Sequence, residues 1–176
     1  MPSALPKRPS PDEYAPYYGR YIDLLPEGDL FDLLERQRDE MLALMNGLSE
    51  EEAGRRYAPG KWSLKEVFGH VIDTERIFAY RALCIGRGER RALPGYDQDA
   101  YVAGAHFDAR PIEDFAEEYR AVRRATILLF RNLSEEELNR RGIANGVELS
   151  VRAAAYIIAG HERHHVRIIR ERYLNP

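Results

Sequence analysis

Two histidines near the end of the chain, His161 and His165, have the spacing that a shared metal ion requires. They lie in the stretch 154–170, where apolar residues recur three and four positions apart, as on one face of an α-helix. Side chains four residues apart lie one above the other on such a face, so two imidazoles can reach one ion. The alternative is a chance group of histidines on an arginine-rich helix.

A third histidine, His70, can complete the site from another helix. By itself it would be interpreted as a packed core residue. It lies about 10 Å from the start of a predicted helix over 64–87, and His165 lies about 12 Å from the end of one over 151–173. The three imidazoles share one level only if these helices are antiparallel. The metal hypothesis therefore predicts an up-down-down-up bundle with a long crossover between its second and third helices.

Three neutral imidazoles suit zinc, nickel, copper or iron, and we expect a divalent ion, with zinc and nickel favoured. Three protein ligands leave one coordination position open, which is typical of catalytic sites. His164 lies about 60° from His161 around the helix and could replace His165. We prefer His165, because a spacing of four residues aligns the imidazoles better.

The composition indicates an ordinary globular protein. Its 176 residues suffice for one domain with a sizeable core. With 26 basic and 29 acidic residues the formal charge is −3, which gives no indication of nucleic-acid binding. No apolar run reaches membrane-spanning length, and no secretory signal is visible. The one cysteine, Cys84, excludes an internal disulfide, and these features together predict a cytoplasmic protein without membrane contact.

Four long amphipathic stretches predict an all-α four-helix bundle without a sheet. They cover about residues 29–47, 64–87, 111–132 and 151–173. An internal echo links two of them to the other two, because Leu48–Glu52 returns later as Leu133–Glu137. Each copy starts with a Ser-x-x-Glu capping box and precedes a histidine-bearing helix. We interpret the chain as two helix–short helix–helix halves.

The remaining segments are an N-terminal arm, a crossover and a turn. Residues 1–12 are rich in proline and predict an extended arm, so we place a single domain at 13–176. Tyr14, Tyr17, Tyr18 and Tyr21 follow the arm and are expected to pack on the bundle. Residues 88–110 show no periodic pattern and predict a long functional loop. Asn145-Gly146 predicts a turn.

Glu162 directly follows His161, so the second histidine motif also matches the His-Glu-x-x-His pattern of zinc proteases, whose glutamate is a general base. In those enzymes the third ligand normally comes later in the chain, whereas here it is His70. Glu162 lies about 100° from His161 around the helix, which favours a solvated or salt-bridged carboxylate.

Several further residues have two interpretations. Asp73 could orient a metal-binding imidazole, or it could pair with Arg76 or with an arginine of another helix. Trp62 could pack the entry to its helix or wall the pocket. Glu66 belongs to a capping box, and Cys84 is too far from His70 to share its metal, so it is interpreted as a small buried hydrophobic residue. The crossover segment 94–106 is a candidate lid, and its polar members Asp97, Asp99 and His106 are more typical of loop polarity than of catalysis.

The sequence resembles the DinB-like superfamily, the DinB/YfiT-like metalloenzymes, over about residues 13–173. The resemblance is carried by Tyr57–His70, by the following Asp73–Arg76, by Pro94–Asp97 and by Gly160–His165. In that family one histidine of the first motif and two of the last bind a divalent metal. The resemblance thus implies an up-down-down-up bundle with the ligands His70, His161 and His165.

Characterised members of that family include thiol S-transferases, which join bacillithiol, mycothiol or glutathione to an electrophile. The resemblance implies a metal-dependent thiol S-transferase as the leading hypothesis, with a small-molecule thiol and an electrophile as partners. Two alternatives stay open: a hydrolase that activates water at the same position, and a non-enzymatic stress or interaction protein with a vestigial site. A homodimer is expected from the resemblance and from a tyrosine-rich arm that could cross to a partner. The metal, the thiol and the electrophile stay undetermined.

Overall fold

Four long helices form the body of the protein, as predicted. The computed structural model describes residues 7–174. The long helices are α2 (Leu30–Asn46), α4 (Leu64–Gly86), α6 (Ile112–Arg131) and α8 (Val151–Ile168), and a π-helical segment (Ile169–Leu174) continues α8. The short ones are α1 (Pro16–Ile22), α3 (Glu50–Ala53), α5 (Gln98–Ala105) and α7 (Glu135–Asn139), with 3-10 turns at Pro11–Glu13 and Phe107–Ala109. Among the described residues, none of these helices is long and apolar enough to cross a membrane.

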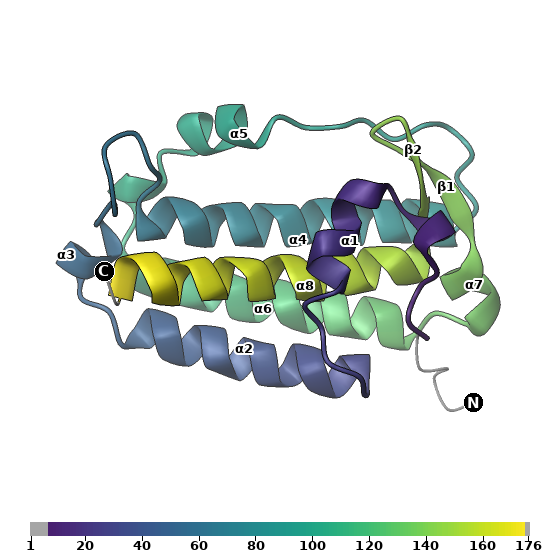
Figure 1. Cartoon of the computed structure of the whole chain (residues 1–176), viewed down its shortest axis with the longest axis horizontal. Coiled ribbons are helices and arrows are strands. Elements are labelled where there is room, and N and C mark those ends of the chain that lie inside the picture. The colour runs from purple at the N-terminus through teal and green to yellow at the C-terminus, as the bar shows by residue number, and fades with distance from the viewer. Residues whose placement is uncertain (1–6, 175–176) are drawn as a thin grey trace.

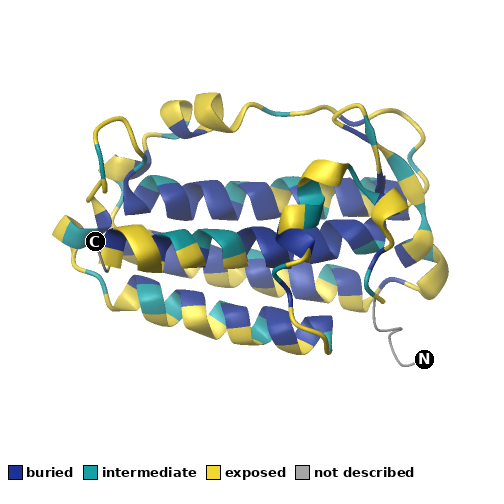
Figure 2. Cartoon of the chain, viewed as in Figure 1, coloured by how far each residue is buried: buried dark blue, intermediate teal, exposed yellow. Residues whose placement is uncertain are grey.

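The helices run up, down, down and up. Figure 1 shows α2 and α8 running in one direction and α4 and α6 in the other. The antiparallel pair α4 and α8 packs side by side at the centre, and most of both helices is buried (Figure 2). The topology that the metal hypothesis required is therefore confirmed.

The crossover between α4 and α6 is more ordered than predicted. The segment 88–110, expected to lack secondary structure, contains α5 and the turn Phe107–Ala109. Asp97 caps α5 by accepting hydrogen bonds from the backbone N–H groups of Asp99 and Ala100. Only Val102 of α5 is buried, so the helix lacks the apolar stripe that would reveal it in the sequence.

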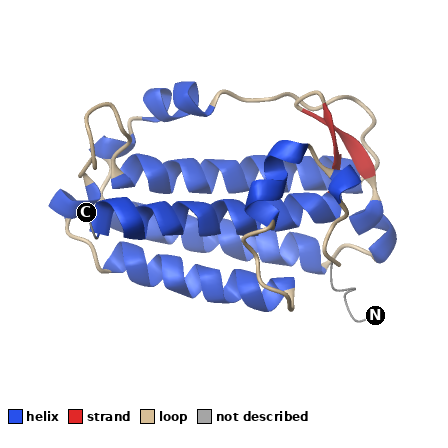
Figure 3. Ribbon diagram, in the orientation of Figure 1, coloured by secondary structure: helices blue, strands red, loops and turns tan. Residues whose placement is uncertain are grey.

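The predicted absence of a sheet is wrong, because a two-stranded antiparallel hairpin precedes α8 (Figure 3). Its strands are β1 (Arg141–Ala144) and β2 (Val147–Ser150). The predicted turn Asn145-Gly146 joins them, and both residues have positive φ, 53° and 75°, as the favoured two-residue hairpin turns require. Four-residue strands are too short for sustained alternation, which is why they were missed.

The segment before α4 and the segment before α8 have the same backbone geometry. Ser63 and Ser150 cap these helices, and each pairs in a β-bridge with an arginine, Arg56 or Arg141. The next residue of each helix donates its N–H to the arginine before that one: Leu64 to the Arg55 carbonyl at 3.1 Å and Val151 to the Arg140 carbonyl at 3.0 Å. The internal repeat in the sequence is thus matched by a repeat in the backbone geometry before α4 and α8.

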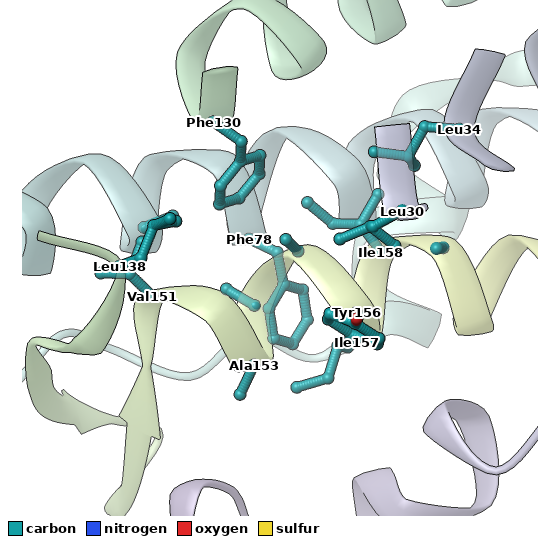
Figure 4. Packing of buried hydrophobic residues seen from close by; sticks show 14 of the residues in the cluster. Leu30, Leu34, Phe78, Phe130, Leu138, Val151, Ala153, Tyr156, Ile157 and Ile158 are labelled. Atoms are coloured by element: carbon teal, nitrogen blue, oxygen red, sulfur yellow. The ribbon is translucent and has the colours of Figure 1, made fainter. Parts of the chain in front are cut away.

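The hydrophobic core lies between the four helices. Figure 4 shows one part of it, where Phe78 of α4 and Phe130 of α6 approach Ile157 and Ile158 of α8. The N-terminal segment is tied to this body: Arg8 donates to the Ile22 carbonyl at 2.7 Å, and Tyr14 and Tyr18 pack on the core. Residues 1–6 of the predicted arm lie outside the described residues.

Candidate metal centre

Three imidazoles from α4 and α8 converge on one point. The Nε2 atom of His161 lies 3.0 Å from that of His70 and 3.1 Å from that of His165. Ligand atoms of the three residues all lie within 4.8 Å of one another. The antiparallel helices therefore bring the three histidines to one level. They are the one group of at least three histidine, cysteine or acidic side chains with this geometry in residues 7–174.

The surroundings keep these imidazoles neutral, which is the form that binds a metal. His70 and His161 are buried, 3% and 6% exposed. Burial lowers the pKa of His70 to about 4. Burial also lowers the pKa values of His161 and His165 well below the ordinary value, and the neighbouring histidines add to this effect.

Hydrogen bonding alone does not account for this convergence. A ring nitrogen of a neutral imidazole carries either one proton or one lone pair. His161 Nε2 can therefore make one good hydrogen bond, yet it lies close to two other Nε2 atoms. An ion bound tetrahedrally at about 2.0–2.1 Å holds its ligand nitrogens about 3.3 Å apart. The donor set thus fits a divalent ion that accepts one lone pair from each imidazole.

A glycine precedes a candidate ligand on each of the two helices, and each glycine lets a neighbouring segment of the chain approach closely. A Cβ on Gly69 would lie 2.4 Å from the ring of Phe107, which belongs to the crossover. A Cβ on Gly160 would lie 2.3 Å from the backbone oxygen of Tyr21 at the end of α1. Neither neighbour could be so close to a larger residue. The Gly-His pairs at 69–70 and 160–161 therefore bring the crossover and α1 against the site.

Trp62 packs on the site as well as on the entry to α4. Its ring centroid lies 4.9 Å from that of His70. The hydroxyl of Tyr173, in the π-helical segment, donates to the Trp62 carbonyl at 2.6 Å. Tyr57 packs edge-on against Tyr173 at 5.0 Å between ring centroids. The end of the chain thus holds the aromatic wall beside His70.

Two cavities reach the triad. The first, of about 430 Å³, reaches His161 and is lined by Tyr17, Tyr18, Tyr21 and Tyr96; we call it the tyrosine cavity. The second, of about 250 Å³, reaches His165 and is lined by Tyr57, Trp62 and Tyr173; we call it the tryptophan cavity. The two cavities approach the candidate metal position through different histidines.

Glu162 faces away from the triad into a buried ionic cluster. Its Oε2 accepts hydrogen bonds from the Tyr119 hydroxyl at 2.8 Å and from Arg123 at 2.5 Å, and Arg123 also binds Glu75. Burial raises the pKa of Glu162, although Arg123 opposes that effect. Its Oε1 has no hydrogen-bond partner among the described residues, and Glu162 lines a cavity that includes no member of the triad. Of the two predicted states, the salt-bridged one is confirmed.

Three other candidate residues on the helices also lie outside the triad. Asp73 lies 3.7 Å from Arg76 and makes no hydrogen bond to His70 within the described part of the chain. Burial raises the pKa of Asp73. His164 packs against the Tyr21 and His165 rings, outside the triad. Cys84 is half-buried against the core, in agreement with its packing role.

The crossover brings two of its three polar candidates toward the site. Asp97 lines the tyrosine cavity together with His161, and Asp99 lines the tryptophan cavity together with His165. His106 lies elsewhere, beside Phe107 and Asp108, where its positive φ of 52° ends α5. The crossover therefore borders both cavities.

Two features of the tyrosine cavity were missed from the sequence. Thr74 lies one turn beyond His70 and is hydrogen-bonded to the Tyr96 hydroxyl at 2.8 Å, which connects the crossover to α4. Arg81 lies further along the same face and lines the cavity. Both residues occupy the face of His70 at spacings of three and four, which was the available signal.

The chain is 24% identical over 139 residues to the "Putative metal-dependent hydrolase" of Oceanobacillus iheyensis, covering 78% of this chain and 79% of that protein. Its structure superposes on that of YfiT from Bacillus subtilis with a TM-score of 0.73 and 16% identity, covering 94% of this chain and 90% of the other. That structure is described as "a probable metal-dependent hydrolase with an unusual four-helix bundle topology". The profile of the DinB superfamily matches residues 33–169, more than half of the sequence, and the chain therefore belongs to the DinB superfamily.

Proposed function

We propose that the protein transfers a low-molecular-weight thiol to an electrophile at a divalent ion held by His70, His161 and His165. The observation that carries the proposal is the pair of cavities, one reaching His161 and the other His165. A transfer reaction needs separate places for two substrates beside one reactive centre. A bound zinc or nickel ion would lower the pKa of a coordinated thiol and so favour the nucleophilic thiolate.

The residues of the chain would hold the ion and the substrates in position and exclude water from the site. The three neutral imidazoles offer lone pairs without adding charge, which leaves the ion's positive charge available to a thiolate. The rings of Trp62 and Tyr21 flank His70 and His161, with centroid distances of 4.9 Å and 5.3 Å. Such apolar walls lower the local polarity, which strengthens the attraction between a cation and an anionic sulfur.

Hydrolysis is the second candidate, and the names of the two relatives favour it. A hydrolase of the His-Glu-x-x-His kind needs its glutamate as a general base beside the ion. Glu162 is instead bound to Tyr119 and Arg123. Among the described residues, no carboxylate joins the three histidines in one ligand group. These contacts favour transfer over hydrolysis.

The test is a conjugation assay on protein loaded with zinc or nickel. Bacillithiol, mycothiol and glutathione are each offered with the electrophile monochlorobimane, and ester cleavage is followed in parallel with 4-nitrophenyl acetate. We expect metal-dependent conjugation with one of the thiols, lost in His161→Ala and kept in His164→Ala. Metal-dependent ester cleavage without conjugation would establish the hydrolase instead. A loaded protein that is inactive in both assays would favour the non-enzymatic alternative.

We further propose that the reaction takes place in the cytoplasm, where small thiols stay reduced, and that the protein is a homodimer. The tyrosine-rich segment packs on its own bundle through Tyr14, Tyr18 and Tyr21. A dimer would therefore use another surface than this segment. Light scattering at micromolar concentration tests it, and a mass near the 20.3 kDa of a single chain would contradict it.

A further inference from the structure

Arg81, on α4, is a buried arginine that has no acidic partner among the described residues. Its side chain is 2% exposed. One Nη2 group donates to the Pro94 carbonyl at 2.9 Å, and the guanidinium lies 5.0 Å from the Phe78 ring centroid. Within residues 7–174, no carboxylate lies at salt-bridge distance from it. Buried charges are normally paired, because an isolated charge loses its hydration.

The other buried charged residues show that this is unusual in the molecule. Each of them makes an ion pair: Lys65 with Glu50, Glu13 with Arg152, and Arg123 with both Glu75 and Glu162. Arg81 therefore differs from the other buried charged residues of the described chain. Its negative partner must come from outside the described chain if it is to be paired at all.

Arg81 borders a cavity with room for such a partner. Arg81 lines the tyrosine cavity, whose walls include the rings of Tyr18, Phe78 and Tyr96. The other charged residue that lines the cavity is Asp97, and its Oδ1 accepts the N–H groups that cap α5. Arginine has five N–H donors, and one of those of Arg81 is used on Pro94. Donors are thus available to an anion that enters between the aromatic walls.

The distance between Arg81 and the triad limits the size of that anion. Arg81 lies eleven residues beyond His70 on α4, about 16 Å along the axis. The side chains of Arg81 and His70 both lean toward the N-terminus of α4, so the axial distance between their backbones also approximates the axial distance between their ends. The separation to be bridged is therefore about 16 Å, which an elongated small organic molecule can span.

We propose that the tyrosine cavity binds one of the two substrates through a carboxylate that pairs with Arg81, while the reactive end of that substrate lies at His161. The planar guanidinium fork matches a carboxylate with two parallel hydrogen bonds. One guanidinium balances the single charge of a carboxylate, whereas a phosphate dianion would keep an excess charge in a buried place. The inference rests on the proposed function, because it assigns the cavity to one of that reaction's substrates.

The test is a binding measurement on metal-free protein, so that no ligand can be held by an ion. Calorimetry compares 3-phenylpropionate with its neutral amide, 3-phenylpropanamide, which has the same shape. We expect the acid to bind at least about tenfold more tightly, since a hydrogen bond to a charged group contributes about that factor. Equal binding of acid and amide would overturn the proposal, and so would tighter binding of 2-phenylethyl phosphate than of the acid.

Variants locate the effect. Arg81→Gln should bind acid and amide equally, whereas Arg76→Gln, an exposed arginine of the same helix, should keep the preference. A preference that persists in folded Arg81→Gln would place the anion elsewhere. If Arg81→Gln does not fold, Arg81→Lys replaces it: the charge stays but the fork is lost, and the preference should shrink.

The result is separable from that of the conjugation assay. Binding of the acid through Arg81 without any conjugation would leave this anion site in place and remove the proposed reaction. Conjugation by a protein that does not distinguish acid from amide would keep the reaction and remove the site. With both intact, Arg81→Gln should raise KM for carboxylate-bearing substrates at unchanged metal content.

Discussion

The histidine triad and the Glu75–Arg123–Glu162 cluster are two buried polar groups that adjacent residues of α8 build on different faces. His161 joins the first and Glu162 the second. In the cluster, opposite charges meet, and Arg123 is bound to both carboxylates. In the triad, groups of the same kind meet, each with a lone pair to offer. Opposite charges stabilise one another, whereas three converging imidazoles need a bound cation between them.

The cluster also differs in what it does for the fold. Arg123 is fully buried, and its Nη1 additionally donates to the Leu34 carbonyl at 3.2 Å. It thereby connects α6 to α2, α4 and α8. Glu75 and Glu162 keep the pKa of Arg123 well above its ordinary value, although burial opposes them. The cluster therefore holds the bundle together, while the triad faces the two cavities.

The largest expected effect concerns the metal. We expect about one divalent ion per purified chain, and His161→Ala or His165→Ala should abolish it, because two histidines bind far more weakly than three. His164→Ala, the matched control on the same helix, should keep the ion. Elemental analysis is the measurement. Full occupancy in the triple alanine variant of His70, His161 and His165 would show that the triad is not the site.

The next largest effect concerns the cluster. Arg123→Leu leaves two buried carboxylates without their common partner and should lower the free energy of unfolding by about 3–5 kcal/mol. The exposed neighbour Arg124→Leu should change it by less than about 0.5 kcal/mol. Urea denaturation of the metal-free proteins measures both. Similar stabilities of the two variants would mean that the cluster does not connect the helices as described.

A third effect depends on pH and on Glu13, a paired carboxylate near the start of the chain. Burial raises its pKa, but hydrogen bonds from Arg152, the Ser10 backbone and Ser150 outweigh this and lower the pKa to about 2. Its ionised form thus stabilises the protein above pH 4.5, and this contribution, about 3 kcal/mol, is lost as the pH falls toward 2. Unfolding measured from pH 7 to pH 2 should show this loss in the wild type. The Glu13→Gln curve should lack it, and parallel curves would contradict the assignment.

The smallest effect sharpens the comparison most. Glu162→Gln should leave the metal content unchanged and the conjugation rate within about twofold, because Glu162 belongs to the cluster and not to the triad. Stability should fall modestly through the weakened contact with Arg123. A large loss of catalytic rate with full metal occupancy would return Glu162 to the role of general base.

The convergence of the three histidines and the helix order could be predicted because each has a local signal. His161 and His165 are four residues apart on one face, and the depth of His70 in its helix fixes the direction of α4 relative to α8. The capping boxes at Ser49, Ser63 and Ser134 mark helix starts, and all three are confirmed. Such features involve neighbours along the chain, which a sequence displays directly.

The missed features depend on neighbours that are distant in the sequence. Arg81 lies on the same helix face as His70, which was a local signal, but its contact with Pro94 and its place in the tyrosine cavity depend on other segments of the chain. The partner of Glu162 is Arg123, on another helix, one of many arginines in the chain. The hairpin had its Asn145-Gly146 signal, but it also needs Leu93 of the crossover, which pairs with Ile143 and Asn145. In each of these three cases the structure depends on contacts between segments that are distant in the sequence.

The repeated backbone geometry in front of α4 and α8 has a consequence for how this protein can change in length during evolution. The two caps, Ser63 and Ser150, lie at opposite ends of the bundle, and the histidines are reached by counting inward: about two turns to His70 and about three turns to His161. An insertion of one residue in either interval turns the histidine beyond it by about 100° and shifts it by about 1.5 Å. Insertions and deletions are therefore compatible with the site in the crossover and in the hairpin, but not between a cap and its histidine.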